Sequence, residues 1–179
     1  VEGRLTIRPM PGLLPGLQLS YFGLYAKGNV EGASADLPTY MVQMGMLSYE
    51  HPWVVLVAQA FLTEGNAKGD WADGSGDALK TFGYSVFGNL RVPVGSMKLA
   101  AFGRFDHFNA DTDDVLAKDA SYQMIIAGLS LDVYKGNMIV LAYEGTFHSD
   151  NFAKKKKVPA AGTKLGDDHK GQLVYQIKF

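Results

Sequence analysis

Along most of this chain apolar and polar residues alternate with a period of two, which is the pattern of β-strands whose two faces meet different surroundings. The best candidate for a helix by length is residues 120–134, but helical spacing gives this segment no continuous apolar side. A spacing of two places Ile125, Leu129 and Val133 on one side. The pattern therefore predicts a strand here as well.

The same alternation predicts nine strands, most of them longer than the strands of ordinary globular domains. They cover approximately residues 3–9, 16–27, 38–49, 52–64, 80–92, 96–108, 120–134, 137–148 and 170–179. Most of these segments reach the length of about 9–11 residues that a tilted strand needs to cross a lipid bilayer. The chain is therefore predicted to be all-β and built from long strands.

Short and long connections alternate along the chain. The short connections are 11–15, 50–52, 93–95 and 135–136, and the long ones are 28–37, 65–79, 109–119 and 149–169. This alternation predicts an antiparallel up-and-down meander with tight turns at one end and polar loops at the other. The turns recur about every 42 residues, as β-propeller blades do, but a blade divides that length among four short strands rather than two long ones.

One side of the predicted strands is apolar, and the other is mixed and carries charges in mid-strand. On 137–148, for example, Leu141 and Tyr143 share the apolar side, whereas Glu144 lies on the other. A soluble barrel would point the apolar side inward. Two observations favour an outward-pointing apolar side. The charged side also holds uncharged, space-filling residues such as Phe102, as the interior of a partly packed barrel does. Aromatic residues lie at strand ends on the apolar side, as they do in the girdles at the membrane interfaces. These aromatic residues are Tyr40, Phe82, Phe147 and Phe179.

Polar-in and apolar-out strands separated by turns are typical of a transmembrane antiparallel up-and-down β-barrel. In such a barrel the charged side chains line a pore and set its ion selectivity. The predicted pore-lining residues are Arg4, Arg8, Arg91, Lys98, Arg104, Asp106, Asp132, Glu144 and Lys178. Basic residues outnumber acidic ones in this set, which predicts a preference for anions. The alternative is that neighbours such as Arg104 and Asp106 neutralise each other within the barrel wall and play no part in selectivity.

The C-terminal segment GQLVYQIKF alternates and ends on Phe179. It resembles the last strand of bacterial outer-membrane β-barrel proteins, whose final aromatic residue belongs to the signal that the barrel-assembly machinery reads. The resemblance assigns this signal to Tyr175, Ile177 and Phe179. It also implies a periplasmic C-terminus, extracellular long loops, and contact with outer-membrane lipid and lipopolysaccharide.

A second resemblance covers GRLTIRPMPGLLPGLQLSYFGLYAKG (Gly3–Gly28), which is similar to a hairpin of phosphate-selective porins of the O/P type, and GRFDHFNADTDD (Gly103–Asp114), which is similar to a strand-to-loop edge of such porins. It implies a channel for passive diffusion of small hydrophilic solutes, including anions, and allows a homotrimer. Porins of this kind have about 16–18 strands, so residues 1–179 would be a porin-like segment from the C-terminal half of a longer chain. The alternative is that residues 1–9 do not span the membrane and the other eight strands close a small structural or adhesive barrel without a pore.

Composition excludes several other classes of protein. With 47% hydrophobic and 20% charged residues, the chain is neither disordered nor collagenous. A net charge of -1 gives no electrostatic signal for nucleic acid. The absence of Cys excludes disulfides and thiolate chemistry. The sequence contains no run of 18 apolar residues, so no membrane helix is predicted. Val1 already begins a strand-like segment, so no signal peptide is expected within the sequence.

The longest loop contains a basic run, Lys154, Lys155, Lys156 and Lys157. This run is expected either to attract anionic solutes or lipopolysaccharide phosphates, or simply to be a solvated loop. Another loop alternates Asn109, Asp111 and Asp113 as the start of a calcium loop does, but the required Gly and closing Glu are missing. A turn-forming acidic loop is the simpler interpretation.

Nothing in the sequence predicts an enzyme or a cofactor. The four His residues share no metal-ligand spacing, so no metal site is predicted. His107 is expected on the apolar side near the rim, where some outer-membrane hydrolases hold a catalytic His. No G-x-S-x-G motif or matching Ser accompanies it.

Overall fold

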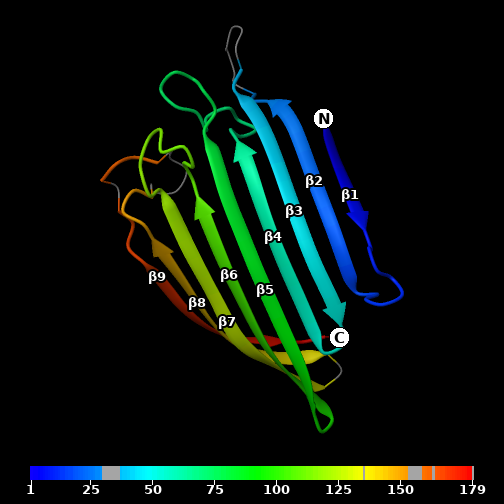
Figure 1. Ribbon diagram of the computed structural model, residues 1–179. Helices are drawn as coiled ribbons and strands as arrows, with labels where there is room; N and C mark the ends of the chain where they lie inside the picture. Colours follow the sequence, from blue (N-terminus) through cyan, green and yellow to red (C-terminus); the bar gives the residue numbers. More distant parts are fainter. Residues whose placement is uncertain (30–36, 135, 153–158, 163, 179) are drawn as a thin grey trace.

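The computed structural model describes residues 1–29, 37–134, 136–152, 159–162 and 164–178. They form one antiparallel sheet of nine strands in chain order (Figure 1). The strands are β1 (Glu2–Ile7), β2 (Leu17–Lys27), β3 (Thr39–His51), β4 (Val54–Glu64), β5 (Lys80–Val94), β6 (Met97–Asn109), β7 (Ser121–Tyr134), β8 (Asn137–His148) and β9 (Asp168–Gln176). The predicted all-β, up-and-down antiparallel arrangement is thus confirmed. Within the described ranges, no helix has the length and apolar character of a membrane span.

The strand boundaries lie close to those predicted, with the largest difference at β9. β1 ends at Ile7, before Pro9, which has no N–H to donate to a neighbouring strand. β9 begins at Asp168, opposite Thr146 of β8, and its last pair joins Gln176 to Met138. The short turns gather at one end of the sheet and the long loops at the other (Figure 1).

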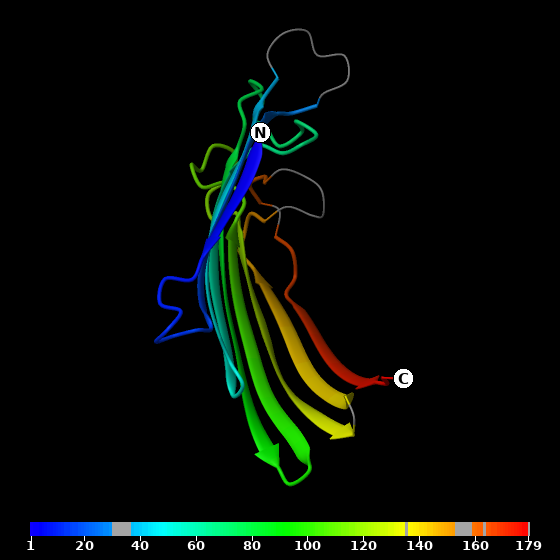
Figure 2. The ribbon, with the colours of Figure 1, turned by 90° about the vertical axis from the view of Figure 1, so that its right-hand side faces the viewer.

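The sheet is curved but not closed (Figure 2). Among the described strands, β1 pairs only with β2, and β9 pairs only with β8. A closed barrel of eight strands would need β9 to pair with β2, but the partners of β2 are β1 and β3. The closed eight-stranded alternative is therefore not the arrangement seen here. Both β1 and β9 leave an edge of unpaired backbone groups.

The register separates two faces across all nine strands. One face is called the apolar face. It holds a row of successive cross-strand partners: Ile7, Leu19, Leu47, Ala58, Val86, Phe105, Ile125, Gly145 and His169. The polar face is the opposite one, which holds Arg104 and Asp106. Within the strands, the charged Lys and Glu residues of the apolar face are confined to the long-loop end. They are Lys27, Glu64 and Lys80.

The two faces differ in exposure. On the apolar face, Leu129, Leu141 and Leu173 are 51%, 60% and 75% exposed. On the polar face, most side chains of β2–β8 are buried or half-buried, because side chains crowd together on the inside of a curved sheet. The buried hydrophobic residues in the described ranges are Leu79, Ala100, Ala110, Ala117 and Ala120, which are mostly small and mostly lie in or beside loops. The large apolar side chains therefore do not form a core within the sheet.

Aromatic rings on the polar face pack over glycines of the adjacent strand. Phe61 of β4 covers its cross-strand partner Gly83, and Phe102 of β6 covers its partner Gly128. A Cβ added at Gly128 would lie 2.6 Å from Cζ of Phe102. These contacts help to set the strand register.

Tyr40 corrects one sequence-based assignment. It was expected on the apolar face, but it lies opposite Ala26, in alternation with Val42 and Met44, on the polar face. The pattern was ambiguous at this point because both sides of β3 begin with apolar residues. Phe82 and Phe147 do lie on the apolar face. Phe179 lies outside the described residues.

Candidate functional site

The polar face collects the charged residues that the sequence pattern assigned to a pore. The register places seven of them there: Arg4, Arg91, Lys98, Arg104, Asp106, Asp132 and Glu144. Arg8 follows the end of β1, and Lys178 follows the end of β9. The backbone N–H of Lys178 donates a hydrogen bond to Oδ1 of Asn137, at 2.7 Å.

Four further charged residues share this face and were missed by sequence reasoning. They are Glu2, Glu50, Asp168 and Lys170. Each continues the alternation of its strand, but each lies at or near a strand end, where the pattern is weakest. With these residues included, acidic and basic side chains on the polar face are nearly equal in number. Preference for anions therefore stays a prediction that depends on which charges are neutralised locally.

One basic residue of this set is neutralised within its own strand. Nε of Arg104 donates a hydrogen bond to Oδ1 of Asp106, at 2.9 Å. Asp106 is only 7% exposed, and its other carboxylate oxygen, Oδ2, is buried without a partner. Removing Arg104 would leave a buried, uncompensated charge. The pairing that was considered as an alternative to a selectivity role is thus present at Arg104.

Other charges face each other between strands. Lys98 lies directly opposite Asp132, and Glu144 lies directly opposite Lys170. Opposite charges at such positions attract each other across a sheet. Oδ1 of Asp132 also accepts a hydrogen bond from the backbone N–H of Gly136, at 3.3 Å, so this carboxylate helps to close the β7–β8 turn.

A row of rings crosses the polar face near the long-loop end. Phe108, Tyr122 and His148 are successive cross-strand partners, and their ring centroids lie 5.6 Å and 6.2 Å apart. Phe152 of the β8–β9 loop contacts this row, 5.1 Å from Tyr122 and 5.5 Å from His148. The start of the β8–β9 loop, at Phe152, therefore lies on the polar side of the sheet, the side toward which the sheet curves (Figure 2).

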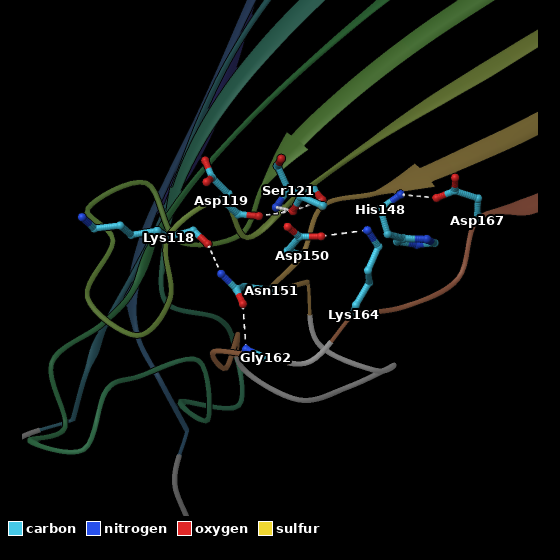
Figure 3. A network of polar contacts seen from close by, with 10 residues as sticks. Lys118, Asp119, Ser121, His148, Asp150, Asn151, Gly162, Lys164 and Asp167 are labelled. Carbon is cyan, nitrogen blue, oxygen red and sulfur yellow. Dashed lines mark hydrogen bonds and ion pairs between the residues drawn. The ribbon is translucent and has the colours of Figure 1, made fainter.

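A polar network ties the β8–β9 loop to the β6–β7 loop (Figure 3). Nδ2 of Asn151 donates to the carbonyl oxygen of Lys118 at 2.7 Å, and Oδ1 of Asn151 accepts from the N–H of Gly162 at 2.7 Å. Nearby, Lys164 pairs with Asp150 at 2.8 Å, and this hydrogen bond lowers the pKa of the Asp150 carboxyl. Sequence reasoning missed the network because it depends on the path of two loops.

The acidic β6–β7 loop is organised by its own hydrogen bonds. Asp111 is fully buried, and its carboxylate accepts hydrogen bonds from the backbone N–H groups of Val115, Leu116 and Ala117. Asp113, which would be the next calcium ligand, pairs with Lys80 at 2.9 Å. The described residues form no group of three or more acidic or His side chains that could hold a metal ion. The geometry is that of a turn-forming loop.

The remaining candidates are placed only in part. Tyr175 and Ile177 are 59% and 54% exposed, with Tyr175 on the apolar face. The run Lys154–Lys157 and Phe179 lie outside the described residues, so their roles stay predictions. His107 lies on the apolar face as expected, where its ring packs 5.3 Å from that of Tyr84.

No protein-family model, curated protein or solved structure matches this chain. The interpretation of the polar face therefore depends on its own geometry and on the resemblance of the segments quoted above.

Proposed function

We propose that this chain forms part of the wall of a porin-like β-barrel in a bacterial outer membrane, through which small hydrophilic solutes diffuse passively. The apolar face contacts lipid, and the polar face lines a water-filled lumen. One observation carries this proposal: across nine strands, the charged Lys and Glu side chains of the apolar face are confined to the long-loop end, while large apolar side chains in its middle, such as Leu129, Leu141 and Leu173, are half-exposed or more. Monomeric soluble proteins rarely expose so large an apolar surface.

The backbone hydrogen bonding of the sheet also suits a lipid bilayer. In lipid every backbone N–H and C=O must be paired within the protein, and an antiparallel meander achieves this everywhere except at its two outer edges. In the proposed barrel, the free edges of β1 and β9 pair with further strands. A barrel of about 16–18 strands leaves an aqueous channel, whereas eight strands leave an interior filled by side chains. The smaller, non-conducting barrel would need β9 to pair with β2, and among the described strands β9 pairs with β8 alone.

Selectivity in such a channel comes from fixed charges along the lumen. Arg91 and Lys98 belong to none of the ion pairs found among the described residues, whereas Arg104 is paired with Asp106. Arg91 and Lys98 are therefore the stronger candidates for attracting anions. The orientation follows from the resemblance to outer-membrane barrels, with the long loops outside the cell and the short turns in the periplasm.

The test is conductance of the full-length protein in a planar bilayer under a salt gradient. We expect stepwise, ohmic conductance, and Arg91→Glu should shift the reversal potential toward cation selectivity. Arg91→Lys keeps the charge and should leave the reversal potential near that of the wild type. Folded, membrane-inserted protein without conductance would overturn the proposal, whereas conductance with no shift would remove Arg91 from the selectivity determinants.

A further inference from the structure

A hollow of about 270 Å³ lies at the short-turn end of the sheet. It is lined by Pro52, Trp53, Arg91, Val92, Pro93 and Lys98. The turn between β3 and β4 supplies one side, and the β5–β6 hairpin, which reaches past that turn in Figure 1, supplies the other. Its size is just below the range of about 300–1,000 Å³ for ligand pockets, which suits a small ligand.

The backbone holds these residues in place. The N–H of Arg91 donates a hydrogen bond to the carbonyl oxygen of Trp53, at 2.7 Å, so the β3–β4 turn is fixed beside β5. Pro93 lies directly opposite Lys98, which makes Arg91 and Lys98 diagonal neighbours on the polar face. Trp53 is 50% exposed, so its indole ring is available to a ligand.

The two cations of the hollow, Arg91 and Lys98, belong to none of the ion pairs found in the described part of the chain. The nearest acidic partner in the register, Asp132 opposite Lys98, accepts the Gly136 N–H with one of its oxygens. Two neighbouring cations repel each other, and an anion placed between them would relieve that repulsion. A guanidinium group also matches the planar, two-oxygen geometry of a carboxylate.

We propose that this hollow binds a small organic anion, a carboxylate carried on an aromatic or similarly flat apolar body. The Arg91 guanidinium and the Lys98 ammonium contact the carboxylate, and the Trp53 indole packs against the body. The prolines on either side keep the hollow rigid. The inference rests on the proposed function only for the way in which the anion reaches the hollow. In the proposed barrel, the hollow lies at the periplasmic end of the lumen, where a permeating solute would pass.

The test is ligand-observed fluorine NMR on the full-length protein in detergent micelles, with 4-fluorobenzoate as the probe. We expect saturable broadening of the probe signal, with affinity reduced at least fivefold in Arg91→Gln, in Lys98→Gln and in Trp53→Leu. Lys80→Gln removes a cation at the opposite end of the sheet and should bind as the wild type does. The neutral probe 4-fluorobenzyl alcohol has the same ring without the charge, and it reports partition into the micelle.

Equal broadening in the wild type and all three hollow variants would overturn the proposal, as would equal saturable binding of the neutral probe. Lys98 is exposed, so Lys98→Gln is expected to fold and to keep the test decisive even if another variant does not. Failure of the channel is separate from failure of the hollow. A protein that binds the probe without conducting refutes the channel alone, and one that conducts without binding refutes the hollow alone.

Discussion

The apolar face and the polar face belong to the same nine strands, yet their side chains have different neighbours. Leu129 and Ser130 are adjacent in β7 and lie on opposite faces. Leu129 is 51% exposed and is opposite Ala101 and Leu141, whereas Ser130 is half-buried and is opposite Ala100 and Val140. The polar face has an ion pair, and a loop residue, Phe152, packs on its rings. The apolar face has mainly its own neighbouring side chains.

This difference shows where the two faces obtain their stability. Side chains on the polar face lose contacts within the protein when they are truncated and clash with their neighbours when they are enlarged. Side chains on the apolar face expose apolar surface that the described part of the protein does not bury, and a surrounding apolar phase would cover it. An ordinary sandwich or soluble barrel would show the opposite distribution, because its apolar face would be the packed one.

The largest effect is expected from a charge placed on the apolar face. In the full-length protein folded in lipid vesicles, Leu129→Arg should lower the free energy of unfolding by about 2–4 kcal/mol, the cost of Arg on the lipid face at mid-depth. Ser130→Arg puts the same charge on the polar face of the same strand, where water in the lumen can solvate it, and should cost less than Leu129→Arg. Denaturant titration followed by tryptophan fluorescence measures both. Equal losses would contradict the assignment of faces.

An intermediate effect is expected from adding one methyl group to a glycine. Gly128→Ala would bring the new Cβ within 2.5 Å of the Leu141 carbonyl oxygen and 2.6 Å of the Phe102 ring, and should destabilise the protein by about 1–3 kcal/mol through overpacking. Gly103→Ala, on the apolar face of the next strand, meets nothing closer than the Ile126 carbonyl oxygen at 3.9 Å. It should be neutral, or stabilising by about 0.4–1 kcal/mol. If the order of these two variants in the same titration were reversed, the packing difference between the faces would be refuted.

The smallest effect is expected in the loops that attach to the polar face. Asn151→Ala removes the two hydrogen bonds to Lys118 and Gly162, so the Gly162 amide should exchange with solvent faster. The global free energy of unfolding should change by less than about 1 kcal/mol. Asp150→Ala removes only an exposed ion pair and should leave that exchange rate nearly unchanged. Unchanged exchange in Asn151→Ala would show that the network does not hold the loop.

Much of the fold could be predicted because it depends on patterns among residues close together in the sequence. The nine strands, the alternating turns and loops, and the side of the sheet on which Arg91, Arg104 and Glu144 lie all follow from a period of two. Strand ends were harder, because a residue such as Lys170 has few neighbours along the chain to establish the alternation. Tyr40 was assigned to the wrong face for a related reason: apolar residues begin β3 on both sides, and only pairing with β2 separates them.

The sequence by itself determined the strands, their antiparallel order and the division of residues between two faces, because each depends on side chains one or two positions apart. Only the tertiary structure decided which charges are neutralised, where Phe152 packs and which residues meet at the hollow beside Trp53. Those contacts join residues from different strands and loops, and their distances depend on register and on curvature. Register joins Lys98 to Asp132, and the turn before β4 brings Trp53 to Arg91. Neither contact has a local sequence signal, because the chain between the partners can take many paths before the sheet forms.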